Sequence, residues 1–194
     1  MTLAFAALVG IMVAVLAGSV FQDGKSAFAV AQPGTLTNGA PQQWAATGAD
    51  HAAQISDTGV CGTDVTYVAG DNDNDDDRFD VDLTSLAVIP ANATINSVDA
   101  AVCDENINQA GGSSTYRFYA IVNGGSKFYS SSRGPGAKTT ATLAADPTDL
   151  LKSALTSLSV GVEKNNSQDI ARVYQLAIVV NYTLAAPSGE LPQA

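Results

Sequence analysis

The feature that most constrains the fold is an apolar run without charged side chains, from Met1 to Gln22. If helical, such a run rises about 33 Å, which is enough to cross the hydrocarbon core of a bilayer. A helix that is apolar on every side has to be buried in lipid or among other helices. The run therefore predicts a hydrophobic assembly or membrane helix at residues 1–31, distinct from the rest of the chain.

Three interpretations of this segment stay open from the residues alone. Small residues at Ala27, Ala29 and Ala31 favour a cleavable secretory signal, although no Lys or Arg precedes the apolar run. A permanent membrane anchor usually has flanking positive charge, for which only Lys25 is nearby. In the third interpretation a basic leader has already been removed and Met1 is the mature N-terminus. The third interpretation accounts best for the missing charge.

Met1-Thr2-Leu3, followed by the apolar run, resembles the start of a type IV pilin after cleavage by prepilin peptidase. Phe5 stands where bacterial members usually have Glu, so the resemblance is closest to archaeal-like members, which join an apolar helix to a β-sandwich. The resemblance covers roughly residues 1–31. It implies membrane insertion before assembly, and then packing of the helix with copies of itself in a filament core. The implied assembly residues are the bulky ones, namely Leu3, Phe5, Leu8, Ile11, Val15 and Leu16.

The remaining chain has the pattern of an antiparallel β-sandwich. After a linker and first extended segment at 32–62, short alternating runs predict a head domain at 63–184 and a loose tail at 185–194. Phe79 and Val81 share one face of such a run, and Asn123-Gly124-Gly125 predicts a hairpin turn. Pro147 after Asp146 predicts one short helix that includes Leu150, Leu151, Ala154 and Leu155.

The predicted fold class is therefore α+β. A long hydrophobic N-terminal helix precedes a β-sandwich of jelly-roll or immunoglobulin-like type with one short helix.

The chain has two cysteines, Cys61 and Cys103. In an exported protein they predict a disulfide, with free buried thiols as the alternative. Loop entropy gives such a bond a stabilising effect of roughly 3–4 kcal/mol.

Acidic residues dominate the charge, with 19 Asp and Glu against 9 Lys and Arg, for a net charge of −10. Such a surface repels phosphate backbones, so nucleic acid is not expected as a partner. The acidic residues are densest at positions 71–77, where they alternate like the first ligands of a calcium loop. A solvated acidic loop is the alternative. The candidate Ca²⁺ ligands are Asp71, Asp73, Asp75 and Asp77.

Catalytic motifs are missing from the sequence. The single histidine, His51, lies in a loop-like region and is expected to be solvated, and no nucleophile elbow, phosphate loop or zinc-binding helix is present. We therefore predict no enzymatic activity. Three sequons give the glycosylation candidates Asn92, Asn165 and Asn181, of which Asn165 has the most loop-like context.

The leading functional hypothesis is a structural subunit of an extracellular type IV pilus-like filament on the cell surface, whose β-sandwich serves adhesion or protection. The first alternative is a membrane-anchored surface module that is lectin-like, binds surface glycans and uses Ca²⁺. Another is a structural protein of a virion or appendage. Four tyrosines are candidates for stacking on sugars, with the sheet core as the commoner place for such rings: Tyr116, Tyr119, Tyr129 and Tyr174.

Overall fold

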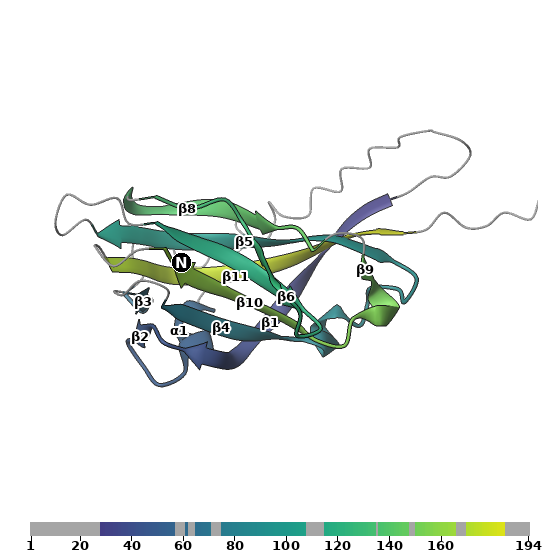
Figure 1. Cartoon of the computed structure of the whole chain (residues 1–194), viewed down its shortest axis with the longest axis horizontal. Helices are drawn as coiled ribbons and strands as arrows, with labels where there is room; N and C mark the ends of the chain where they lie inside the picture. The colour runs from purple at the N-terminus through teal and green to yellow at the C-terminus, as the bar shows by residue number, and fades with distance from the viewer. Residues whose placement is uncertain are drawn as a thin grey trace, which may run out of the picture.

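The computed structural model describes residues 28–56, 61, 65–70, 75–107, 115–134, 136–147, 150–165 and 170–184. Within them the chain forms antiparallel strands arranged in two layers (Figure 1). The elements in chain order are β1 (Phe28–Gln42), β2 (Ala45–Ala46), α1 (His51–Ile55), β3 (Val68–Gly70), β4 (Asp76–Asp82), η1 (Leu83–Leu86), β5 (Thr94–Ile107), β6 (Tyr116–Val122), β7 (Lys127–Tyr129), β8 (Gly136–Ala145), β9 (Leu150–Leu151), η2 (Lys152–Ala154), β10 (Leu158–Lys164) and β11 (Ile170–Leu184).

The two layers are here called sheet A and sheet B. In sheet A, β5 pairs with β11 along almost its whole length, β8 and β9 pair with the other side of β5, and β3 and β2 continue beyond β11. In sheet B, the order is β4, β10, β6 and β7. Alternate residues of both sheets point inward and form one apolar core, which includes Phe79, Phe118, Val160, Val98 and Ile178.

Strand β1 belongs to both sheets. Its first half, up to Gly34, pairs with β11 in sheet A, and Thr35–Asn38 pair with β4 in sheet B. At the crossing point a Cβ atom on Gly34 would lie 2.7 Å from Ile178 Cδ1 and 3.1 Å from Val81 Cγ1. Glycine therefore lets the strand pass between residues of the two layers where a side chain would meet both.

The predicted α+β class is wrong, because the described residues form an almost entirely antiparallel β protein. Residues 28–31 are expected to end the N-terminal helix. Instead they begin β1 and pair with the final residues of β11, Asn181–Leu184. Alternation in Phe28-Ala29-Val30-Ala31 suits a strand, and the open edge of β11 supplies its hydrogen-bonding partner. None of the helices in the described ranges is long and apolar enough to cross a membrane. Residues 1–27, including all six implied assembly residues, lie outside the described part.

The short helix predicted after Asp146 is also wrong. Leu150–Leu151 form strand β9 against Thr94 and Ile95, and a 3-10 turn, η2, follows. The backbone N–H groups of Lys152 and Ser153 donate to the carbonyls of Ala93 and Ala91, so the neighbouring turn takes the donors that a helix would use. By contrast, the strand predicted around Phe79 and Val81 and the hairpin turn predicted at 123–125 are both present.

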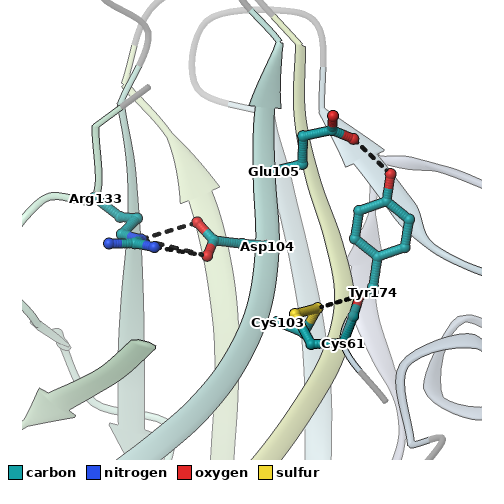
Figure 2. The surroundings of a disulfide bond; sticks show 6 residues. All are labelled: Cys61, Cys103, Asp104, Glu105, Arg133 and Tyr174. Carbon is teal, nitrogen blue, oxygen red and sulfur yellow. Dashed lines mark hydrogen bonds and ion pairs between the residues drawn. A yellow bond between two sulfur atoms is a disulfide. The ribbon is translucent and has the colours of Figure 1, made fainter. Parts of the chain in front are cut away.

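Cys61 and Cys103 form the predicted disulfide, with their Cα atoms 5.5 Å apart. Figure 2 shows the bond beside Tyr174. On the same side of β5, the Tyr174 hydroxyl donates to Glu105 Oε2 at 2.7 Å. Asp104 points to the other side and pairs with Arg133 at 3.0 Å. The bond therefore fixes Cys61 to the outer face of sheet A.

Replacing both cysteines with serine should lower the free energy of unfolding, because the bond closes a loop between residues 42 positions apart. Loop entropy predicts a loss of about 4 kcal/mol. Urea unfolding of Cys61→Ser/Cys103→Ser against the oxidised chain measures it. The reduced wild-type chain is the control and should match the variant; a midpoint unchanged by reduction would contradict the bond.

Candidate ligand-binding face

The outer face of sheet B holds six charged and aromatic side chains in mutual contact. They come from four strands that lie side by side, β4, β10, β6 and β7. Their strand neighbours Phe118, Ala120 and Val162 point into the core, so these side chains point away from it. We call this group the sheet B platform: Asp76, Arg117, Tyr119, Lys127, Tyr129 and Glu163.

Two buried carboxylates form the centre of the platform. Asp76 and Glu163 are only 7% and 8% exposed, and they pair across β4 and β10. Lys127 Nζ donates to both, at 2.6 Å to Asp76 Oδ2 and 2.5 Å to Glu163 Oε2. Tyr119 donates its hydroxyl to Asp76 at 2.5 Å, while Arg117 Nη2 donates to Glu163 at 2.8 Å. Every carboxylate oxygen in the centre therefore has a donor.

The cations of the platform also lie over its aromatic rings. The Arg117 guanidinium carbon is 3.8 Å from the centre of the Tyr129 ring, and Lys127 Nζ is 4.3 Å from that of Tyr119. The two rings meet edge to face with centres 6.0 Å apart. A Cβ atom on Gly161, which lies opposite Tyr119 in the sheet, would clash with the Tyr119 hydroxyl. Glycine at this position makes room for the buried ring.

The platform is charged but balanced. Burial alone would raise the pKa of Glu163, yet hydrogen bonds from Lys127 and Tyr129 outweigh burial and lower it. Burial alone would lower the pKa of Lys127, and its bonds to Asp76 and Glu163 raise it instead. Burial, followed by the bond to Asp76, raises the pKa of Tyr119. The hydrogen bonds thus favour the ionised forms of Glu163 and Lys127, and the formal charges of Asp76, Glu163, Lys127 and Arg117 sum to zero.

Of the four tyrosines proposed for sugar stacking, one is open to solvent. Tyr129 is 39% exposed, whereas Tyr116, Tyr119 and Tyr174 are buried. The Tyr129 hydroxyl donates to Glu163 Oε2 at 2.9 Å, which fixes the ring. Sequence reasoning did not find Asp76, Arg117, Lys127 or Glu163, because no local motif joins them. Their strand alternation predicts only that they face outward, and the contacts depend on pairing between distant strands.

Only two of the four candidate calcium ligands, Asp75 and Asp77, lie among the described residues, so the calcium site stays a prediction. Asp71 and Asp73 lie outside the described residues. Asp77 faces the core side of β4 and is fully buried, with its Oδ2 2.8 Å from His51 Nδ1. The main chain of Asp75 accepts from the Trp44 indole at 2.9 Å. Within the described part of the chain, no cluster of three His, Cys, Asp or Glu could hold a metal ion.

His51 is not the solvated loop residue that the sequence predicted. His51 is the first residue of α1. Its side chain is 13% exposed and pairs with Asp77. The other oxygen of Asp77, Oδ1, is buried and has no hydrogen-bond partner among the described residues. Burial therefore raises the pKa of Asp77 to about 6, although the hydrogen bond and the charge of His51 act in the opposite direction.

The three sequons lie in different surroundings. Asn92 is exposed in the turn that Ala93 N–H closes on the carbonyl of Pro90. Asn165 Nδ2 donates to the Thr115 and Ser132 hydroxyls, and Asn181 Nδ2 donates to Ser97 within sheet A. Glycosylation stays a prediction, and the most accessible amide is that of Asn92 rather than the expected Asn165.

The fold and this face define an antiparallel β-sandwich with a charged, aromatic outer surface. No protein-family model and no curated protein sequence matches the chain. Among solved structures, it is similar to the CBM22-1-GH10 modules of Clostridium thermocellum xylanase 10B, determined with xylohexaose. The identity is 8% and the TM-score 0.43, over 84% of this chain and 30% of that one.

Two further solved structures are single modules. The CBM22-1 xylan-binding domain of Paenibacillus barcinonensis Xyn10C shares 14% identity, with a TM-score of 0.40, over 78% of this chain and 97% of that one. The C-terminal family 22 carbohydrate binding module of Clostridium thermocellum Xyn10B shares 13% identity, with a TM-score of 0.35, over 80% and 88%.

Asp77→Asn should make the folded state more stable at neutral pH. The pKa of Asp77 is about 6 in the folded chain against 3.8 as its ordinary value. Between pH 3.8 and about pH 6 the Asp77 carboxyl loses its proton in the unfolded chain but keeps it in the folded chain. The free energy of unfolding of the wild type therefore falls as the pH rises through this range. At pH 7 the gain for the variant is at most about 3 kcal/mol, and it should vanish below about pH 4.

Urea unfolding across this pH range measures the difference, with Asp80→Asn, an exposed residue of the same strand, as the control. A variant less stable than wild type at pH 7 would mean that the pairing with His51 outweighs the cost of burial.

Proposed function

We propose that the chain is a non-catalytic, extracellular β-sandwich module that binds a glycan on the sheet B platform. The observation that carries this proposal is the geometry of Tyr129. Its ring is 39% exposed, its hydroxyl is held by Glu163, and the Arg117 guanidinium lies 3.8 Å from the ring centre. An exposed aromatic ring with charged hydrogen-bonding groups at its rim suits a ligand that has both apolar and hydroxyl surfaces.

A sugar ring presents C–H groups on its faces and hydroxyl groups around its edge. The C–H face can stack on an aromatic ring, and the hydroxyls can donate to carboxylates or accept from Arg and Lys. The platform supplies both kinds of group within a few ångströms, because Arg117 and Lys127 lie over its two rings. This combination of one apolar surface and several polar anchors is typical of small-ligand sites.

The charge balance favours an uncharged glycan over a phosphate or sulfate ester. Asp76 and Glu163 pair with Lys127 and Arg117, so neither of these two cations is left to attract an anion. The chain as a whole carries a net charge of −10, which repels polyanions. Because two side-chain cations already balance the two carboxylates, the proposed binding does not require the calcium ion that the acidic loop suggested.

This proposal takes up the alternative function that the sequence raised, a surface module that binds glycans. The disulfide supports an oxidising, extracellular setting for the described domain. The pilus-like filament stays a prediction from residues 1–31, most of which lie outside the described part. Nothing in the proposed binding depends on that filament.

Tyr129→Ala should weaken glycan binding about tenfold or more, equivalent to about 1.4 kcal/mol, because it removes the stacking surface. Affinity electrophoresis against soluble neutral polysaccharides, including the xylan named for the similar modules, identifies a ligand. Calorimetry then measures the affinity of wild type and variant. Tyr129→Phe keeps the ring and should retain most of the binding.

Phe128→Ala is the matched control, since Phe128 is 37% exposed on the same strand but points away from the platform. If wild type binds no neutral polysaccharide, or if both alanine variants weaken binding equally, the proposal is wrong.

A further inference from the structure

Arg78 is the one arginine of the described residues that forms no ion pair with another of them. The other three each have a carboxylate partner: Arg117, Arg133 and Arg172. Arg78 is half-buried in the middle of β4, and its Nε atom is buried without a hydrogen-bond partner among the described residues. Packing therefore holds the stem of this side chain, and no described carboxylate accepts from its Nη atoms.

Arg78 lies in one row with the two tyrosines of the platform. The strand registers place Tyr129 on β7 opposite Tyr119 on β6. They place Tyr119 opposite Gly161 on β10, and Gly161 opposite Arg78 on β4. Residues directly opposite one another share a face of the sheet, so Arg78 belongs to the same outer face as the platform. Neighbouring strands lie about 4.8 Å apart, and three such intervals put the backbone of Arg78 about 14 Å from that of Tyr129.

Glycines lie on both sides of Arg78 in the sheet. Gly161 is opposite it on β10. On the β1 side, a Cβ atom on Gly39 would lie 2.9 Å from the Arg78 carbonyl oxygen and 3.2 Å from Asp80 Oδ1. Glycine inside a strand often marks a place where a ligand or another backbone approaches closely. Burial raises the pKa of Tyr119, and the positive charge of Arg78 acts in the opposite direction, so the guanidinium lies near that hydroxyl.

We propose that Arg78 binds a second sugar unit of the same glycan, which lies across the strands of sheet B from Tyr129 to Arg78. This inference rests on the proposed binding of a glycan at the platform and specifies the form of that glycan. The distance between the two residues is greater than the length of one sugar ring, so a ligand that reaches both is an oligosaccharide or a stretch of a polysaccharide. The planar guanidinium has parallel N–H donors, which suit neighbouring hydroxyl oxygens on one ring.

The carboxylates beside Arg78 favour hydroxyl groups over an acidic group as its ligand. Asp76 and Asp80 stand two residues before and after Arg78, on the same face of β4. Asp80 is exposed, and its Oδ1 accepts from the Ser159 hydroxyl at 2.7 Å. An anion at the guanidinium would be repelled by both carboxylates, whereas a sugar hydroxyl can accept from Arg78 and donate to Asp80. The second sugar unit is therefore uncharged, like the first.

Binding measured against ligand length tests the proposal. The probes are xylo-oligosaccharides and cello-oligosaccharides, from the monosaccharide to the hexasaccharide, in titrations followed by nuclear magnetic resonance. Arg78→Gln should weaken binding of the hexasaccharide about tenfold, because the variant lacks the charged hydrogen-bond donors. Binding of the monosaccharide should not change, because a single ring on Tyr129 does not reach Arg78.

Arg172→Gln is the matched control, since Arg172 is a half-buried arginine on the outer face of the other sheet. It should bind every probe as the wild type does. Equal affinity of Arg78→Gln and wild type for the hexasaccharide, or the same weakening at every length, would overturn the second contact and leave the proposed function intact. An oligogalacturonide that binds more tightly than the neutral probes would overturn the uncharged second unit. If no probe binds the wild type, this inference fails, and the screen of polysaccharides decides on the proposed function separately.

A double variant distinguishes a direct contact from support of the platform. Effects of substitutions more than about 10 Å apart usually add in free energy. Tyr129→Ala combined with Arg78→Gln should therefore weaken hexasaccharide binding by the product of the two single losses. If Arg78→Gln causes no further loss in the Tyr129→Ala chain, Arg78 acts only through the platform and the second contact is wrong.

Discussion

The arrangement of the whole domain depends on the hydrogen bonding of β1 to both sheets. Its first half pairs with β11 and its second half with β4, so one continuous strand fixes the position of sheet A against sheet B. The crossing is possible because Gly34 has no side chain to meet Ile178 and Val81. Once β4 is placed in this way, β10, β6 and β7 follow in order beside it. The platform is a consequence of that order, since its six residues come from these four strands.

Within the platform, Lys127 has a role that no other residue duplicates. It is the one side chain that donates to both buried carboxylates, Asp76 and Glu163. Carboxylates with so little exposure are costly to keep ionised unless a cation accompanies them. Breaking a buried pair by removing one partner usually costs more than the pair contributes. The lysine thus holds β7, β10 and β4 together through charge, and keeps Tyr119 and Tyr129 in fixed positions at the same time.

The sequence predicts the local elements of this domain well and their partners poorly. Alternation around Phe79 and Val81 and the turn at Asn123-Gly124 identify strands correctly, because these signals act between near neighbours. The sequence predicts a helix for the first residues of β1, because an apolar run has no clear period. Only pairing with β11 decides that these residues form a strand. The acidic stretch also shows the limit of pattern. Alternate aspartates predict a cation site at 71–77, which stays a prediction, but the pattern does not show that Asp76 and Asp77 point to opposite faces of β4, toward Lys127 and His51.

Charge distribution distinguishes the platform from the rest of the described surface. Carboxylates that are buried have specific partners: Asp76 and Glu163 meet Lys127, and Asp104 meets Arg133. Apart from Asp77, the other carboxylates of the described residues are exposed or half-buried, where their charge repels polyanions. The platform differs from that acidic background, because its two carboxylates are paired with Lys127 and Arg117. A strongly acidic chain can bring another molecule close only where its own repulsion is absent. An uncharged glycan at the platform satisfies that condition.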